Sequence, residues 1–415
     1  MASTTTTSAN PTDRIPVTVL TGFLGAGKTT LLNQLVRQPD MANAAVLINE
    51  FGEVGLDHHL VDSVDENIVL LDSGCVCCSM QGDLVQALQT LSNRSSRRDI
   101  PPITRVLIET TGLADPAPVI YTLMEHEFVS ARYVCDGIVT VVDATHGLAQ
   151  LNRHREALRQ ASMADRLLIT KTDLTDAATL AALEVRLEAV NPGTPRRIVR
   201  SGQIRSDMIF GAGIYTKGTA SPEVATWLDK PSRGFRTPQR TAGTPAWRPG
   251  NAPGPRRAER HDLRVRSFVI ELPATVPWYG FAATMGRILD THGDKLLRVK
   301  GLVAVYGTET QPLVIHCVQN VAYPAVRLDA WPPGEAFADR HGRMVFIVQD
   351  LSEADEAGIR AALAHLPADS VAARTVAASP WLPTKCWLSQ WVATTSLPSY
   401  QVDGWIVQTR RPRRL

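Results

Sequence analysis

The chain has 415 residues, of which 44% are hydrophobic and 20% are charged, a balance typical of a globular protein with a sizeable core. Lysine and arginine total 43 against 41 acidic residues, so net charge favours neither a nucleic acid nor a membrane surface as partner. No stretch approaches the ~20 apolar residues of a membrane span. The length predicts two or three domains.

The cysteines and the N-terminus indicate the cellular compartment that we expect for the chain. Three of the six cysteines crowd into residues 75–78, which does not suit a disulfide scaffold. A reducing cytoplasm with one thiol-rich site explains that distribution. Residues 1–14 are polar at their start, without the apolar segment of a secretion signal, and we expect them to form a disordered tail.

The segment Gly22–Thr29 reads Gly-Phe-Leu-Gly-Ala-Gly-Lys-Thr and matches the phosphate-binding loop pattern, with an apolar run before it and a helical pattern after it. Glycines let the backbone wrap a phosphate closely, and the helix N-terminus adds partial positive charge. We expect Lys28 to reach the β- and γ-phosphates and the Thr29 hydroxyl to ligate Mg²⁺. The alternative is a glycine-rich turn that binds nothing. The candidate nucleotide-binding residues of this loop are Gly22, Gly25, Ala26, Gly27, Lys28, Thr29 and Thr30.

Apolar runs that suit strands alternate with helical patterns as far as residue 200. The strand candidates are 17–20, 45–48, 67–71, 105–108, 138–142, 167–169 and 198–199, and helix candidates include 83–91, 116–124 and 177–190. This alternation predicts an α/β fold, a P-loop NTPase parallel sheet covered by helices on both faces. Ligands bind such sheets at the carboxyl ends of the strands, where the motifs of this chain fall.

A cysteine cluster, Cys75, Cys77 and Cys78, follows the third strand candidate. Thiolates are soft metal ligands, and three of them leave a tetrahedral ion one ligand short, as a transfer site requires. Glu50, after the second strand candidate, is a further candidate ligand. A buried cysteine cluster and a redox switch are the alternatives.

Two further motifs follow strands. Glu109 is placed to hold Mg²⁺ through water, and the N–H of Gly112 to contact the γ-phosphate, so this segment can sense hydrolysis. After the sixth strand candidate, the Asp173 carboxylate is expected to accept two hydrogen bonds from guanine, with the Lys171 stem packed along the base. Ser201 is expected to offer backbone contacts to the guanine. The alternative for Asp173 is a helix N-cap.

These motifs, in this order, resemble those of the CobW-like metallochaperone GTPases. The resembling segments are 22–30, 49–53, 74–78, 109–116 and 170–174. The resemblance implies hydrolysis of GTP, with Mg²⁺, coupled to delivery of a transition metal from the three cysteines to a client metalloprotein. Zn²⁺ suits the thiolates, and Co²⁺ or Fe²⁺ also accept them. Two positions depart from the family: Thr170 stands where an asparagine is common, and Ile48 where some members have a metal-binding glutamate.

The second half of the chain carries no catalytic constellation. We expect a P-loop GTPase domain at 15–229, a proline- and arginine-rich linker at 230–262, a smaller α+β C-terminal domain at 263–368, and a tail at 369–415 to which no structure is assigned. The strand candidates of the C-terminal domain are 265–272, 296–306, 313–318 and 344–348, with helices at 277–289 and 352–366. It resembles the C-terminal domain of the same family.

The leading hypothesis is a GTPase with slow intrinsic turnover that delivers a metal. A phosphoryl transferase acting on a small molecule and a nucleotide-binding thiol redox sensor are the alternatives. Neither a nucleic acid nor a membrane is expected as partner, and an oligomer is left open.

Overall fold

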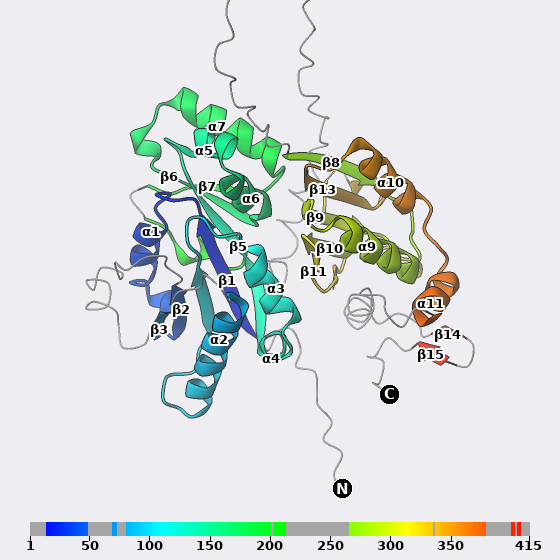
Figure 1. Cartoon of the computed structure of the whole chain (residues 1–415), viewed down its shortest axis with the longest axis horizontal. Helices are drawn as coiled ribbons and strands as arrows, with labels where there is room; N and C mark the ends of the chain where they lie inside the picture. The colour runs from blue at the N-terminus through cyan, green and yellow to red at the C-terminus, as the bar shows by residue number, and fades with distance from the viewer. Residues whose placement is uncertain are drawn as a thin grey trace, which may run out of the picture.

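The computed structural model describes residues 14–48, 69–72, 80–200, 203–212, 265–334, 337–378, 400–402 and 405–407. Within these ranges the chain forms two large sheets, each with its own helices (Figure 1).

The first sheet has seven strands in the order β3-β2-β4-β1-β5-β6-β7, and every neighbouring pair is parallel, which confirms the predicted fold class. β5 begins at Tyr133, earlier than the predicted residue 138. The prediction began too late because a polar residue, Asp136, interrupts the apolar run, although Asp136 is buried in the fold. Its carboxylate accepts hydrogen bonds from the Thr18 hydroxyl and the Gly211 N–H. The strands are β1 (Ile15–Gly22), β2 (Ala44–Ile48), β3 (Val69–Asp72), β4 (Arg105–Glu109), β5 (Tyr133–Asp143), β6 (Arg166–Thr170) and β7 (Arg196–Ile198).

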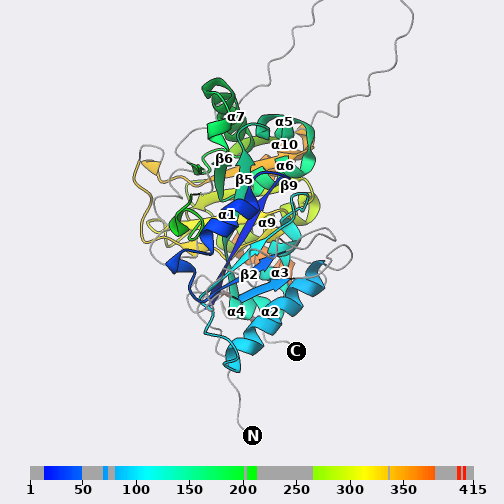
Figure 2. The same cartoon turned by 90° about the vertical axis from the view of Figure 1, so that its left-hand side faces the viewer.

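Helices cover both faces of this sheet because successive strand residues point to opposite sides. Leu20 packs in the cluster that contains α1, whereas Val19 packs with α2 and α3 on the other face (Figures 1 and 2). The helices are α1 (Lys28–Leu35), α2 (Met80–Ser96), α3 (Ala117–Glu125), α4 (Glu127–Arg132), α5 (Gly147–Arg153), α6 (Arg155–Met163) and α7 (Ala177–Val190). Asp176 caps α7 by accepting from the Thr179 N–H, and α7 spans the predicted residues.

The second sheet is antiparallel, in the order β11-β10-β9-β13-β8, with β12 paired to β10. One face packs against α9, α10 and α11 in a single apolar cluster, as predicted for a small α+β unit. Its strands are β8 (Val265–Glu271), β9 (Leu296–Val303), β10 (Leu313–Val318), β11 (Val321–Ala322), β12 (Val326–Arg327) and β13 (Arg343–Gln349), and its helices are α9 (Trp278–His292), α10 (Glu353–Ala364) and α11 (Asp369–Ala378).

Residues beyond 368, to which the sequence analysis assigns no structure, include α11 and a two-stranded pair, β14 (Tyr400–Val402) with β15 (Trp405–Val407). α11 is held to α9 by Asp369, whose carboxylate accepts from the N–H groups of Tyr279 and Gly280.

The opposite face of the second sheet packs onto the first half of the chain (Figure 1). Leu297, Val318 and Ile347 share one buried cluster with Val17 and Val19 of β1. The two halves are therefore joined by a continuous apolar seam. In the part of the chain that the structure describes, no helix has both the length and the apolar character needed to cross a membrane.

Candidate functional site

The phosphate loop follows β1 and has the backbone conformation that its glycines allow. Gly25 and Gly27 have φ of 72° and 94°, in the left-handed region that favours glycine. At Gly22, with φ of 148°, a Cβ would lie 2.4 Å from the Val141 carbonyl oxygen. A Cβ at Gly25 would meet nothing within 4 Å, so this part of the loop is open to a ligand.

Lys28 is the first residue of α1, and its ammonium group lies within the loop. Nζ donates to the Gly22 carbonyl at 2.8 Å, and the side chain is almost fully buried. Thr29 and Thr30 follow it, exposed at the helix N-terminus. An inward ammonium, an exposed hydroxyl and a helix N-terminus together fit a bound triphosphate with Mg²⁺.

The segment after β4 lies beside the phosphate loop. Glu109 pairs in register with Leu20, the Thr110 N–H donates to the Leu20 carbonyl at 2.9 Å, and the Thr110 hydroxyl donates to Thr21 at 2.8 Å. Gly112 touches the loop directly, because a Cβ there would lie 2.7 Å from the Leu24 nitrogen. The structure therefore brings Glu109 and Gly112 next to the phosphate loop.

The segment after β6 braces the same loop. The Thr170 hydroxyl donates to the Ala26 carbonyl at 2.7 Å, so threonine at this position makes a direct contact with the loop. Lys171, with φ of 56°, donates from Nζ to the Gly25 carbonyl at 2.7 Å. Asp173 lies exposed in the adjoining 3-10 turn, and Ser201 lies outside the described residues.

Asp143, at the end of β5, is a site residue that the sequence analysis missed. Its carboxylate accepts from Lys171 Nζ at 2.9 Å and from the Thr145 N–H at 2.7 Å. Burial raises the pKa of Asp143, but the hydrogen bonds from Thr145 and Lys171 outweigh burial, and the net pKa lies below its ordinary value. An acid directly after an apolar run, as at Glu109, is the sequence signal that identifies it.

The proposed metal ligands Cys75, Cys77, Cys78 and Glu50 lie outside the described residues. The strands that lead to them do not: Ile48 pairs in register with both Glu109 and Asp72, so β2, β3 and β4 end at one level.

Elsewhere in the described ranges, no three His, Cys, Asp or Glu residues are arranged to hold a metal ion. The two described cysteines are poor metal ligands because both thiols are buried. Burial raises the pKa of Cys135 to about 12 and that of Cys317 above its ordinary value.

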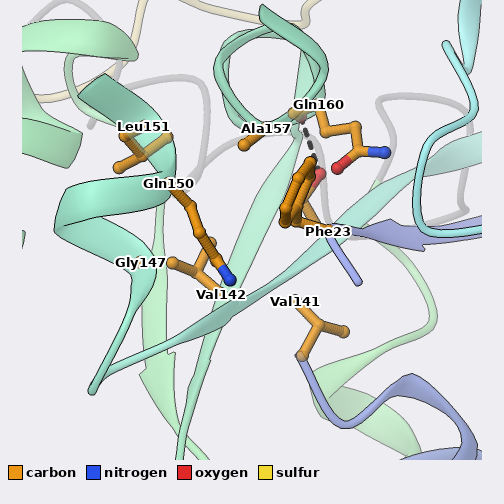
Figure 3. A pocket seen from close by; sticks show the side chains of 9 residues that line it. Phe23, Val141, Val142, Gly147, Gln150, Leu151, Ala157 and Gln160 are labelled. Carbon is orange, nitrogen blue, oxygen red and sulfur yellow. Dashed lines mark hydrogen bonds between the residues drawn. The ribbon is translucent and has the colours of Figure 1, made fainter. Parts of the chain in front are cut away.

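A hollow of about 10 Å³, with room for about one water molecule, lies behind the phosphate loop (Figure 3). It is lined by Phe23 of the loop, by residues of α5 and α6 and by the end of β5, and none of its lining residues is charged. The Phe23 ring also lies 4.7 Å from that of His154. The hollow does not suit a phosphate, and Phe23 anchors the loop to the helices behind it.

Both halves of the chain match known protein families. The family described as CobW/HypB/UreG, nucleotide-binding domain, matches residues 16–197, and the cobalamin synthesis protein CobW C-terminal domain matches residues 265–366. The zinc chaperone YjiA of Escherichia coli is 34% identical over 85% of this chain and 98% of its own length. The zinc chaperone CobW of Sinorhizobium is 28% identical over 87% of this chain and 99% of its own. The crystal structure of Zn(II)-bound YjiA GTPase from E. coli covers 85% of this chain and 99% of its own, at 32% identity and a TM-score of 0.61.

Proposed function

Because the chain belongs to the CobW family of GTPases, we propose that it binds a transition metal at Cys75, Cys77 and Cys78 and delivers it to a client metalloprotein under the control of GTP hydrolysis. Two relatives that match most of the chain are named zinc chaperones, which favours Zn²⁺ as the metal. Thiolates suit Zn²⁺, while Co²⁺ and Fe²⁺ are the next candidates.

The observation that carries the proposal is the common level at which β2, β3 and β4 end, two residues before β1 ends at Gly22. Leu20, Glu109, Ile48 and Asp72 form one rung across β1, β4, β2 and β3. Cys75 is three residues beyond Asp72 in the sequence, and Glu50 is two beyond Ile48. The segment after β4 therefore leaves the sheet between the phosphate loop and the two segments that carry the proposed ligands. Adjacent strands are about 4.8 Å apart, so a change after β4 acts on close neighbours on either side.

In the proposed reaction each residue of this edge has one task. Lys28 stabilises negative charge on the γ-phosphate, the Gly112 N–H donates to it, and Asp173 selects guanine. Thr29 and Glu109 hold Mg²⁺, which when bound neutralises charge on the phosphates.

Thr170 and Lys171 maintain the conformation of the phosphate loop through the carbonyls that they contact. We expect slow intrinsic hydrolysis that metal or client accelerates, and by linkage a change in GTP affinity when metal binds.

The first test measures zinc bound per chain by competition with a chromogenic chelator, with GDP and with the non-hydrolysable analogue GMPPNP. We expect tight zinc binding whose affinity differs between the two nucleotides and is lost in the triple variant Cys75→Ser, Cys77→Ser, Cys78→Ser. Cys135→Ala is the matched control, since its buried thiol is not a ligand. Zinc uptake that survives the triple substitution would exclude the cysteines as the metal site.

Delivery is tested separately, by transfer of ⁶⁵Zn from the loaded chain to client proteins captured in the GMPPNP-bound state. Transfer that requires hydrolysable GTP supports delivery. Retention of the metal on the chain through GTP turnover, with every captured protein, contradicts it.

A further inference from the structure

The helix α6 connects the segment after β4 to the C-terminal sheet. Its contacts with that segment come from two adjacent side chains. Arg159 forms an ion pair with Asp115 at 3.0 Å, and Gln160 donates from Nε2 to the carbonyls of Gly112 and Ala114 at 3.2 and 2.9 Å. α6 thus contacts both a side chain, that of Asp115, and two backbone carbonyls of the turn that carries Gly112.

Gln160 is buried completely, and its amide orientation is fixed because two carbonyls face its nitrogen. Its other amide atom, Oε1, lies on the side of the hollow behind Phe23 (Figure 3) and has no hydrogen-bond partner among the described residues. The side-chain hydrogen bonds of Gln160 in the described structure therefore all go to the turn after β4. A movement of the turn after β4 would therefore move the Gln160 side chain with it.

The C-terminal end of α6, at Met163, is bound to the C-terminal sheet. Arg298 of β9 donates from one guanidinium nitrogen to the Met163 carbonyl, in the last turn of α6, and from another to the Asp165 carboxylate. Both side chains of this ion pair are buried, at 0% and 2% exposure. Asp165 is tied in turn to β5, because its second oxygen accepts from the Ile138 N–H at 2.9 Å.

The two sets of contacts are close together. Gln160 and Met163 are three residues apart, about 5 Å along the helix axis. β9 lies between β10 and β13, at the centre of the second sheet, so a shift of Arg298 acts on the middle of that sheet.

We propose that α6 couples the nucleotide state of the phosphate loop to the C-terminal sheet, with Gln160 as the positioning residue at the turn after β4 and Arg298 as the residue that joins α6 to β9. A γ-phosphate that draws on the Gly112 N–H moves the Gly112 and Ala114 carbonyls, and Gln160 and Arg159 carry that movement into α6. The coupling rests on GTP binding at the phosphate loop and not on metal delivery, so loss of metal uptake in the cysteine variants leaves it intact.

The test compares affinities of the full chain, free of zinc, for GDP and for GMPPNP by isothermal titration calorimetry. In Gln160→Met, which keeps the size of the side chain and removes both hydrogen bonds, we expect GMPPNP to bind about tenfold more weakly and GDP within about twofold of the unsubstituted chain. A purely structural role would weaken both nucleotides or neither, and either result overturns the role of Gln160.

Arg298→Lys tests the contact between α6 and β9. We expect the ratio of GMPPNP to GDP affinity to fall about threefold, and to fall no further when Arg298→Lys is added to Gln160→Met, because both act along one route. Arg155→Ala is the matched control on the same helix: its pair with Asp350 is exposed, and we expect no change in the ratio. An unchanged ratio in Arg298→Lys, or equal effects in both backgrounds, overturns the coupling.

A second measurement needs no substitution and decides the matter if Arg298→Lys does not fold. Amide hydrogen exchange of the unsubstituted chain is compared between the GDP and GMPPNP states. We expect differences in peptides from residues 155–163 and 296–303 as well as in the phosphate loop. Differences confined to the phosphate loop and the turn after β4 would contradict the proposal.

Discussion

The nucleotide edge of the first sheet and the seam between the two halves both depend on polar groups, but in different surroundings. At the nucleotide edge, Thr170 and Lys171 each donate one hydrogen bond to a carbonyl of the phosphate loop, and Asp143 in turn accepts from Lys171. At the seam, Arg298 and Asp165 are buried within an apolar cluster. Lys171 at the edge is partly exposed, so water can replace a lost partner of its ammonium group, whereas both members of the pair at the seam are shut off from water. Substitutions at the edge should therefore alter nucleotide binding, whereas substitutions at the seam should cost stability.

The largest expected effect is at the seam. Arg298→Met leaves the Asp165 carboxylate buried without its cation, and we expect the free energy of unfolding in urea to fall by about 3–5 kcal/mol. Arg155→Met, at an exposed pair, should change it by less than about 0.5 kcal/mol. If the free energy of unfolding of Arg298→Met falls by less than about 1 kcal/mol, the seam tolerates an unpaired acid. The proposed difference in stability between the seam and the nucleotide edge would then be wrong.

At the nucleotide edge the largest effect is expected for Lys28→Ala. It removes the ammonium group within the loop, and single-turnover hydrolysis of GTP should fall by about 10²- to 10³-fold. The fold should persist, with a circular dichroism spectrum and an unfolding midpoint close to those of the unsubstituted chain. Lys295→Ala, at a half-exposed pair in the C-terminal half, should retain full hydrolysis. Hydrolysis within tenfold of normal in Lys28→Ala would contradict the assigned role.

Asp143→Asn tests the brace around Lys171. Removing the charge weakens a charge-assisted hydrogen bond, and we expect GDP and GMPPNP to bind about tenfold more weakly, and equally so. This pattern differs from that of Gln160→Met, which should affect GMPPNP alone. Asp207→Asn, at an exposed pair, is the control. If Asp143→Asn weakened the binding of GMPPNP and GDP unequally, Asp143 would act on the γ-phosphate, as the turn after β4 is proposed to do, and not on the loop as a whole.

The smallest effect concerns pH and the seam. Burial, then the cations Arg298 and Lys300, lower the pKa of His316 well below its ordinary value in the folded chain. As pH falls below about 6.5 the unfolded chain takes up a proton that the folded chain does not, so stability is lost with falling pH by at most about 1.4 kcal/mol per unit.

His316→Gln should make the unfolding free energy less dependent on pH between 7.5 and 5.5, by about 1 kcal/mol over that range. The exposed His365→Gln should leave the dependence unchanged. Parallel pH profiles for His316→Gln and the unsubstituted chain would show that His316 does not contribute.

The sequence by itself determined the features that reside in short stretches of chain. The phosphate loop, the strand ends at Glu109 and Thr170, the strands of the first sheet and the four longer strands of the second follow from local spacing and apolar periodicity, because those patterns fix backbone conformation and face. The two-residue strands β11 and β12 are too short to show such a pattern. The family resemblance rested on the same short motifs. The shorter helices α4, α5 and α6 lacked enough turns to show a clear period.

Only the tertiary structure decided which distant side chains meet. Gln160 reaches the turn after β4 across 48 and 46 positions, and Arg298 reaches Asp165 across 133. A glutamine on a short helix and an arginine in a strand carry no local sign of such partners, since the contact depends on how the sheets pack. The brace from Asp143 through Lys171 to Gly25 is of the same kind: each residue suits its own strand end or loop, and only the parallel order of the strands brings them together.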